Sequence, residues 1–227
     1  MIGEQIAARM PLPEGAAEKL NAFDALLRAE NQKMDLTAVT DPEEALYAHY
    51  LDSLAGAAHL PHGARVIDLG SGAGFPGLPL AIARPDLSFV LLDAQRKRVD
   101  FLSRAIAALG IAAEAVHARA EDYARAHREA ADAVISRAVA RLPVLLEWAL
   151  PLVRMGGKCL LWKGPGIAEE LADAARVSPL LGGGAPRVLP VSIPGRDWAH
   201  VLVHVEKQTE TPKTFPRKAG MAMKRPL

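Results

Sequence analysis

Short apolar runs alternate with helical patterns along most of the chain after residue 64. Runs typical of buried strands occupy 65–69, 88–92, 111–118, 133–136 and 158–162. Helical patterns that follow them end at Ala83 and at Gly110, and two more cover 142–150 and 167–177. Two last runs, 188–193 and 200–205, have no helix between them and predict an antiparallel hairpin at one edge. The alternation predicts an α/β fold with a mostly parallel, doubly wound sheet and right-handed crossovers.

The first sixty residues have a different pattern, because their apolar residues recur only at the spacing typical of helices. One helix is predicted from Pro13 to about Asn31. A second begins at Asp41, an N-cap residue followed by Pro42 at the first helical position and by Glu44 in capping-box position, and runs to about Leu54. We therefore predict a helical N-terminal cap (1–60), a catalytic domain (61–206) and a C-terminal tail (207–227). The glycines at 182–184 predict a flexible turn.

A glycine-rich turn follows the first predicted strand and carries the clearest chemical signal. A turn between a strand and a helix places backbone N–H groups at the carboxyl edge of the sheet. Two ligand patterns overlap here. Residues 72–77 (GAGFPG) match the dinucleotide pattern G-x-G-x-x-G, with Asp93 about 20 residues further on. Residues 68–74 (DLGSGAG) match the D-x-G-x-G-x-G pattern that S-adenosylmethionine-dependent methyltransferases share.

The register of the turn favours the methyltransferase pattern. Gly70 follows the strand directly, whereas Gly72 comes three residues after Leu69. Asp68 suits an amine-bearing ligand better than a pyrophosphate, and Pro76 removes a donor that a pyrophosphate would need. The alternative is a turn that only packs a strand against a helix. The predicted cofactor-binding residues in this region are Asp68, Gly70, Ser71, Gly72, Gly74, Phe75 and Asp93. In both ligand patterns Asp93 accepts hydrogen bonds from ribose hydroxyls.

Two later loops are expected to complete the site. After the third strand, Ala120 and Glu121 offer a backbone N–H and a carboxylate to an adenine edge, or else Glu121 only stabilises a helix N-terminus. After the fourth strand comes Arg137, which holds either a cofactor carboxylate or a phosphate, or forms a surface ion pair. This loop has neither an Asn/Asp-Pro-Pro-aromatic run nor a Pro-Cys nucleophile, and Cys159 is expected to be a buried apolar residue. No general base is apparent in this loop. The pattern therefore suits a methyl acceptor that attacks through a ring-nitrogen lone pair, such as guanine N7, with catalysis by positioning and electrostatics.

The net charge of +1 hides a strong segregation along the chain. Residues 1–64 carry four basic and ten acidic side chains, whereas residues 211–227 carry five basic and none acidic. Such basic clusters can neutralise phosphates, although a solvated tail and helix face would look the same. The candidate RNA-binding residues are Lys97, Arg98, Lys213, Arg217 and Lys218. Deletion of 211–227 is therefore predicted to weaken RNA binding and to leave cofactor binding intact.

The remaining titratable clusters give weaker signals. His49 and Asp52 share one helix face, which favours a helix–helix hydrogen bond over contact with RNA or closure of the cofactor site. His200 and His204 share a strand face without an acidic partner nearby, so no metal site is expected. A single cysteine excludes a disulfide framework. With neither a signal peptide nor a membrane-spanning run apparent, we expect a cytoplasmic protein.

Together these motifs resemble one family over nearly the whole chain, the bacterial 16S rRNA (guanine-N7) methyltransferases, also called the glucose-inhibited division protein B family. The matching segments are Asn31-x-x-x-x-Leu36-Thr37, Asp41-Pro42-x-Glu44, His49-x-Leu51-Asp52-Ser53, the turn 67–77, Leu92-Asp93-x-x-x-Lys97-Arg98 and Ile135-Ser136-Arg137-Ala138. Phe75 departs from the Leu or Ile usual in the family and adds an aromatic face.

The resemblance implies a Rossmann-like class I methyltransferase fold with a seven-stranded sheet. It implies methyl transfer from S-adenosylmethionine to N7 of guanine 527 in the 530-loop of 16S rRNA. The implied partner is the small ribosomal subunit, and the implied enzyme is a monomer. Cofactor contacts then fall on Gly70, Phe75, Ala120, Glu121 and Arg137, with Arg137 also the candidate catalytic residue and with no metal. The alternatives are a methyltransferase acting on another RNA or a small molecule, an NAD-binding oxidoreductase, and a non-catalytic RNA-binding protein.

Overall fold

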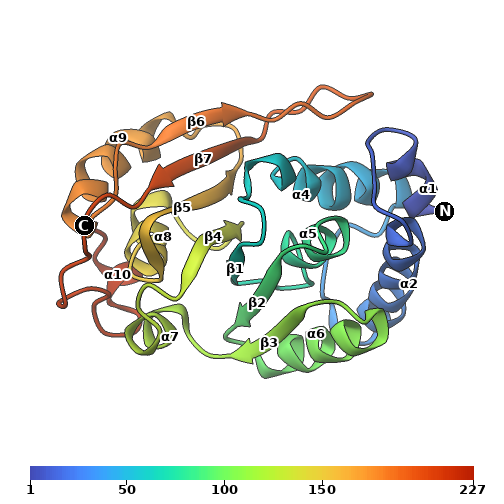
Figure 1. Ribbon diagram of the computed structural model, residues 1–227, viewed down its shortest axis with the longest axis horizontal. Helices are drawn as coiled ribbons and strands as arrows, with labels where there is room; N and C mark the ends of the chain where they lie inside the picture. Colours follow the sequence, from blue (N-terminus) through green and yellow to red (C-terminus); the bar gives the residue numbers. More distant parts are fainter.

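A computed structural model describes all residues, 1–227, and contains one seven-stranded sheet (Figure 1). The strands are β1 (Arg65–Leu69), β2 (Ser88–Asp93), β3 (Ala113–His117), β4 (Ala131–Arg137), β5 (Val153–Lys163), β6 (Arg187–Pro190) and β7 (Val201–Glu206). Their order is β3-β2-β1-β4-β5-β7-β6. β1 to β5 are parallel, and β7 lies antiparallel to both β5 and β6. The predicted mostly parallel sheet with an antiparallel hairpin at one edge is confirmed.

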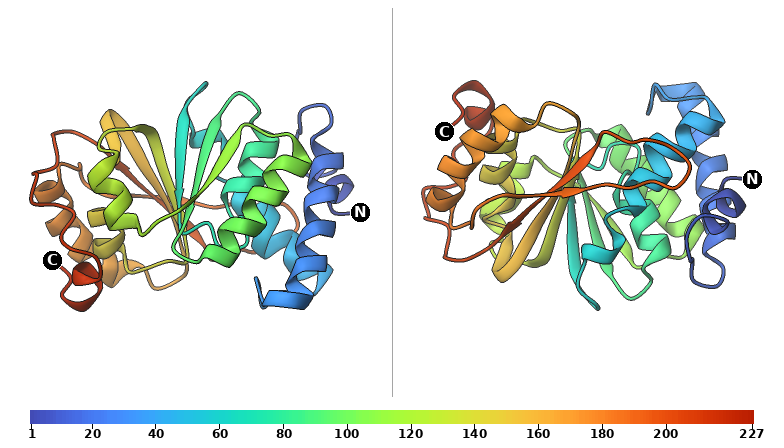
Figure 2. Two further views of the ribbon diagram at one scale, coloured as in Figure 1. Left: turned by 90° about the horizontal axis from the view of Figure 1, so that it is seen from below. Right: turned by 90° about the horizontal axis from the view of Figure 1, so that it is seen from above.

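Helices cover both faces of the sheet (Figure 2). One face carries α5 (Gly77–Ala83) and α6 (Arg96–Leu109), and the other carries α7 (Ala120–Ala126), α8 (Leu142–Ala149) and α9 (Ala168–Val177). Each face has its own cluster of buried apolar side chains. Because β1 to β5 run in parallel, their carboxyl ends meet at one edge. The loops after β1, β2, β3 and β4 therefore come together there.

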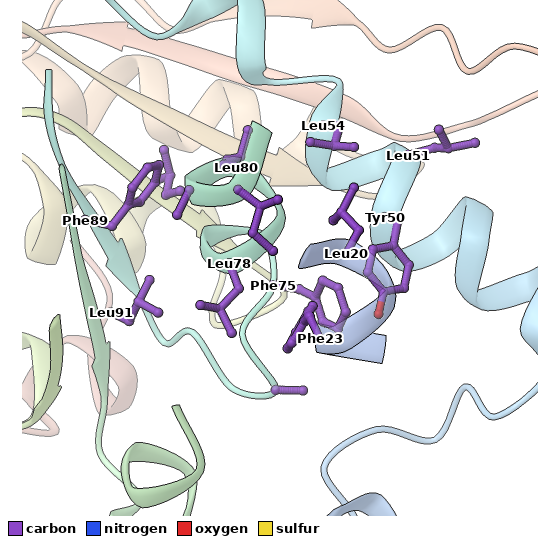
Figure 3. Close-up of a cluster of buried hydrophobic side chains, with 14 of the residues drawn as sticks. Leu20, Phe23, Tyr50, Leu51, Leu54, Phe75, Leu78, Leu80, Phe89 and Leu91 are labelled. Atoms are coloured by element: carbon purple, nitrogen blue, oxygen red, sulfur yellow. The ribbon is translucent and has the colours of Figure 1, made fainter. Parts of the chain in front are cut away.

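The N-terminal helices extend the first of these two cores. They are α1 (Ile2–Ala7), α2 (Ala16–Met34), α3 (Pro42–Ala45), the π-helical η1 (Leu46–Leu51) and α4 (Asp52–Leu54). Phe23 of α2 and Tyr50 of η1 pack against Phe75 in the glycine-rich turn, with ring centroids 5.4 and 5.3 Å from that of Phe75 (Figure 3). The cap thus shares its apolar core with the sheet, and its aromatic side chains pack against the glycine-rich turn.

Several local predictions need correction. The sequence pattern does not indicate the N-terminal helix α1, and α2 continues three residues past Asn31. The glycines 182–184, predicted to be a flexible turn, are all buried. A Cβ on Gly182 would lie 2.2 Å from the carbonyl oxygen of Thr209, so this turn is packed against the chain that follows β7. Glycine serves there for close approach of two backbone segments, which composition alone does not distinguish from flexibility.

The C-terminal residues after β7 are also folded. They lie along α7 and α8 and end in a short helix, α10 (Met221–Lys224) (Figure 1). Ala222 of α10 is buried in the second core. In no part of the structure is there a helix with the length and apolar character required to cross a membrane.

Candidate active site

The glycine-rich turn is held in place by the neighbouring strand ends. The N–H groups of Gly70 and Ser71 donate to the carbonyl oxygen of Leu92 at 2.8 and 3.1 Å. Gly70 has φ +73°, and a Cβ there would lie 2.5 Å from Cγ2 of Val139, in the loop after β4. Glycine at position 70 therefore permits both the left-handed backbone and the close approach of two loops.

Asp93 joins the end of β2 to this turn. One carboxylate oxygen accepts a hydrogen bond from the N–H of Gly72 at 2.9 Å, and the other accepts from the N–H of Gln95 at 2.8 Å. Arg98 lies 3.7 Å from the same carboxylate. These bonds fix the Asp93 carboxylate at the carboxyl edge of the sheet, where a ribose would need its acceptors.

A cavity of about 170 Å³ lies at this edge. Its walls include residues from the loops after β1, β2, β3 and β4, together with α8 and the C-terminal segment: Gly70, Asp93, Ala120, Glu121, Val139, Trp148, Gly220 and Met223. The cavity is smaller than the roughly 300–1,000 Å³ of a complete ligand pocket, so it accommodates one part of a cofactor. The structure thus brings together four of the predicted cofactor residues: Gly70, Asp93, Ala120 and Glu121.

The chemistry of these walls fits the adenosine part of S-adenosylmethionine. The Asp93 and Glu121 carboxylates accept hydrogen bonds, as ribose hydroxyls and the exocyclic amine of adenine require. Ala120 is the first residue of α7, so its N–H has no acceptor within the helix. Val139 and Met223 supply apolar surface for the purine ring. Trp148 adds an indole N–H that is buried and has no hydrogen-bond partner.

Other predicted cofactor residues lie outside this cavity. Ser71 and Gly74 are buried within the turn, where the Ser71 hydroxyl donates to the backbone carbonyl of Asp68. Asp68 is fully buried, and one oxygen accepts from the N–H of Gly77 at 3.1 Å, at the start of α5. Its other oxygen has no partner. In this structure Asp68 positions the first residue of α5, and contact with a cofactor stays a prediction.

Burial raises the pKa of Asp68 to about 7, because few polar groups compensate its charge. Since the folded state keeps the proton that the unfolded state releases near pH 4, the contribution of Asp68 to the free energy of unfolding is expected to fall between about pH 4 and 7. Asp68→Asn removes this titration, so the free energy of unfolding of the variant relative to the unaltered chain is expected to rise over this pH range. Urea unfolding from pH 4 to 8 without ligand measures it, with the exposed Asp197→Asn as control. An unchanged slope in Asp68→Asn would contradict the assignment.

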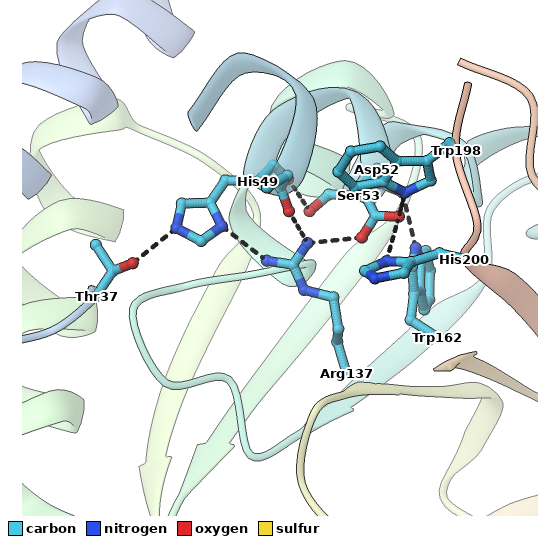
Figure 4. A network of polar contacts seen from close by, with 9 residues as sticks. Thr37, His49, Asp52, Ser53, Arg137, Trp162, Trp198 and His200 are labelled. Carbon is cyan, nitrogen blue, oxygen red and sulfur yellow. Dashed lines mark hydrogen bonds and ion pairs between the residues drawn. The ribbon is translucent and has the colours of Figure 1, made fainter. Parts of the chain in front are cut away.

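Arg137, at the end of β4, points toward the cap rather than into the cavity (Figure 4). Its guanidinium donates to Asp52 and to the backbone carbonyl of Ala48, each at 2.8 Å, and lies 3.5 Å from Nδ1 of His49. It also lies 5.4 Å from the ring centroid of Phe75. Arg137 is therefore the connection between β4, the glycine-rich turn and the cap.

The helix–helix hydrogen bond expected for His49 and Asp52 is therefore wrong. Both side chains face Arg137, 85 or more residues away in sequence. His49 also stacks on Phe75 with ring centroids 4.6 Å apart, and its Nε2 is 2.7 Å from the Thr37 hydroxyl. Burial, and then the charge of Arg137, lower the pKa of His49 to about 4, so the imidazole is neutral at pH 7.

Asp52 has further partners that sequence reasoning missed. Its carboxylate is fully buried and accepts from the indole N–H of Trp198 at 2.8 Å and from Nδ1 of His200 at 3.1 Å. The Trp162 indole donates to the backbone carbonyl of Asp52 at 2.7 Å. The expectation that His200 lacks an acidic partner is thus wrong, because Asp52 reaches it across 148 residues. Burial alone would raise the pKa of Asp52, but hydrogen bonds from His200 and Arg137 lower it.

The predicted RNA-binding residues have different surroundings. Lys97, Lys213 and Lys218 are exposed. Arg217, in contrast, forms a two-pronged ion pair with the buried carboxylate of Glu147, at 2.6 and 2.9 Å. Cys159 is buried, as predicted, and no cluster of metal-ligating side chains is present.

Comparison with known proteins identifies the family of the chain. Residues 16–193 match the family model described as rRNA small subunit methyltransferase G. The chain is 43% identical over 223 residues to the Clostridium perfringens protein of that name, covering 96% of this chain and 93% of that one. It is 44% identical over 213 residues to the protein of that name from Moorella thermoacetica, covering 92% and 89%.

Solved structures show the same fold at low sequence identity. A Thermus thermophilus branched-chain polyamine synthase bound to 5'-methylthioadenosine has TM-score 0.60, 21% identity, and covers 88% of this chain and 66% of that chain. The T. thermophilus 16S rRNA N2 G1207 methyltransferase, solved with AdoMet and guanosine, has TM-score 0.52 and 24% identity, covering 77% and 41%. The family decides against the dinucleotide alternative for the glycine-rich turn. The chain belongs to the rRNA small subunit methyltransferase G family and is an S-adenosylmethionine-dependent methyltransferase.

Proposed function

We propose that this protein methylates N7 of guanine 527 in the 530-loop of 16S rRNA, as a cytoplasmic monomer acting on the small ribosomal subunit. The observation that carries the proposal is the cavity at the carboxyl edge, where Gly70, Asp93, Ala120 and Glu121 meet. The Asp93 and Glu121 carboxylates in this cavity offer acceptors for adenosine. Arg137 lies on the other side of the glycine-rich turn, where it contacts the cap.

When bound, S-adenosylmethionine supplies an electrophilic methyl group on a sulfonium. The N7 lone pair of guanine forms the new bond to the methyl carbon as the carbon–sulfur bond breaks, which leaves a neutral thioether and a positive charge on the purine. No proton has to leave N7 before attack, so this chemistry requires no general base. The chain contributes orientation and electrostatics.

The cap offers a second cavity, of about 460 Å³, in which we place the guanine. Its walls include Asp24, Asn31, Thr37 and His49, all from cap segments. His49 connects this second cavity to the glycine-rich turn, because it stacks on Phe75 and lies beside Arg137. Its neutral imidazole adds no positive charge to repel the cationic product.

Exposed cations supply the contacts to RNA phosphates in this proposal. Lys97 at the start of α6 and Lys213 and Lys218 in the C-terminal segment are free of ion pairs within 4 Å. Arg98 and Arg217 are each paired with a carboxylate, which reduces the charge they offer. Each phosphate contact should appear as a steeper loss of RNA affinity with salt.

The decisive experiment is transfer of a labelled methyl group. The acceptors are small subunits and naked 16S rRNA from a strain that lacks this modification, and the product is mapped by mass spectrometry of nuclease fragments. We expect one methyl group on N7 of guanine 527, and none transferred to subunits already modified there. Modification of another nucleotide would overturn the specific assignment, and the absence of transfer to any RNA would favour a small-molecule acceptor or a non-catalytic role.

A further inference from the structure

The C-terminal segment 207–227 is anchored to the domain far more firmly than a solvated tail would be. Arg128 donates to the backbone carbonyl of Phe215 at 2.7 Å and also to that of Thr211. Arg125 donates to the carbonyl of Arg217 at 2.9 Å. The Arg217 guanidinium is paired with Glu147, a carboxylate only 1% exposed. These contacts bring residues 217–224 to α7 and α8 (Figure 1).

At that place the segment meets the cofactor cavity. The N–H of Gly220 donates to a carboxylate oxygen of Glu121 at 2.8 Å. Gly220 and Met223 form part of the cavity wall, next to Ala120 and Trp148. Glu121, which its position after the third strand suggests for the adenine edge, is thus already held by the C-terminal segment.

We infer that residues 217–224 form the wall of the cofactor pocket on its adenine side, and that Gly220 is the positioning residue for Glu121. The inference rests on the proposed function, since it assigns adenine to this cavity. A carboxylate held through one oxygen presents the other in a fixed direction, here to the exocyclic amine of adenine. Met223 covers the apolar face of the ring.

Trp148 in the same wall carries a buried polar group without a partner. Its indole N–H is buried without an acceptor, an arrangement that is rare in folded proteins unless a ligand or a water supplies the missing partner. Trp148 lies in the cavity wall with Gly220 and Met223.

This assignment reverses one expectation from the sequence. The charge pattern predicts that deletion of 211–227 leaves cofactor binding intact, but the same segment contributes two residues to the cofactor cavity. It also carries the exposed Lys218 and Lys224, so a deletion would affect RNA and cofactor together. Smaller changes are needed to separate the two.

Two truncations and two point variants test the inference by calorimetry with S-adenosylhomocysteine. Removal of residues 219–227 is expected to raise its Kd about tenfold or more, whereas removal of 225–227, which keeps Gly220 and Met223, should change it less than about threefold. Met223→Glu should raise the Kd about fivefold or more, and Met221→Glu should not, because Met223 lines the cavity and Met221 does not. The point variants answer the question if the longer truncation does not fold.

Protection from trypsin supplies a second readout. Saturating S-adenosylhomocysteine should slow cleavage after Lys218 and Lys224 in the full chain, because the ligand holds the wall. A Kd that Met223→Glu leaves unchanged or lowers, or cleavage unaffected by the ligand, would overturn the inference. Failure of the unaltered chain to bind S-adenosylhomocysteine would instead count against the proposed cofactor site itself.

Discussion

Replacing Asp52 with alanine is expected to destabilise the protein by about 3–5 kcal/mol and to abolish methyl transfer. The substitution removes the acceptor shared by Arg137, Trp198 and His200. Arg137 would then be a largely buried cation without its counter-ion, at the connection between the cap and β4. The loss of activity follows because the cap would no longer be fixed next to the glycine-rich turn.

Urea unfolding of the two proteins measures the change in stability, with His200→Ala as the matched control. The control removes one partly exposed donor and leaves the pairing with Arg137 intact, so about 1 kcal/mol is expected. Because the pKa of Asp52 is lowered in the folded state, its contribution is present above about pH 4 and is lost as the pH falls below that value. An Asp52→Ala protein within about 1 kcal/mol of the control would refute this account.

Replacing Asp93 with alanine should raise the Kd of S-adenosylhomocysteine at least about 30-fold. Hydrogen bonds to a charged group contribute about 1.5–3 kcal/mol each, and about 1.4 kcal/mol is tenfold in Kd. The change removes the acceptor proposed for the ribose and also frees the N–H groups of Gly72 and Gln95. The turn and the ligand therefore both lose a partner.

Calorimetry measures the affinity, and Asp100→Ala is the matched control. Asp100 is an exposed carboxylate on α6 that pairs with Arg96 and does not line the cavity. The Kd of this control should equal that of the unaltered chain. Asp93→Asn should fall between, because the amide oxygen keeps one of the two backbone hydrogen bonds. Equal affinity of Asp93→Ala and Asp100→Ala would remove Asp93 from the site.

Local signals predicted much of the fold and one part of the site. The strand at 88–92 and the turn at 70–77 are set by short-range pattern: an apolar run, then residues that end it. In a parallel sheet the carboxyl ends of neighbouring strands must meet, so strand order and residue pattern suffice to place Gly70, Asp93 and Glu121 at one edge. The cavity contains all three.

Where prediction failed, the partners lie far apart in the chain. His49 and Asp52 do lie on one helix face, as their spacing predicts, but that face meets Arg137. The three glycines at 182–184 have the composition of a flexible turn, yet they are packed against Thr209. The charges of residues 211–227 are typical of a solvated basic tail. In the structure, however, Arg217 of this segment pairs with the buried carboxylate of Glu147.

The sequence by itself determined the sheet, the glycine-rich turn and, through the motifs, the family and its methyl donor. Each of these depends on residues close in the chain or on a topology that admits few alternatives. Only the tertiary structure decided that Asp52 holds Arg137 and that Gly220 holds Glu121. The physical reason is that such pairs form between surfaces that meet after folding, and neither the period of a helix nor the charge of a segment specifies which buried carboxylate a distant donor will find.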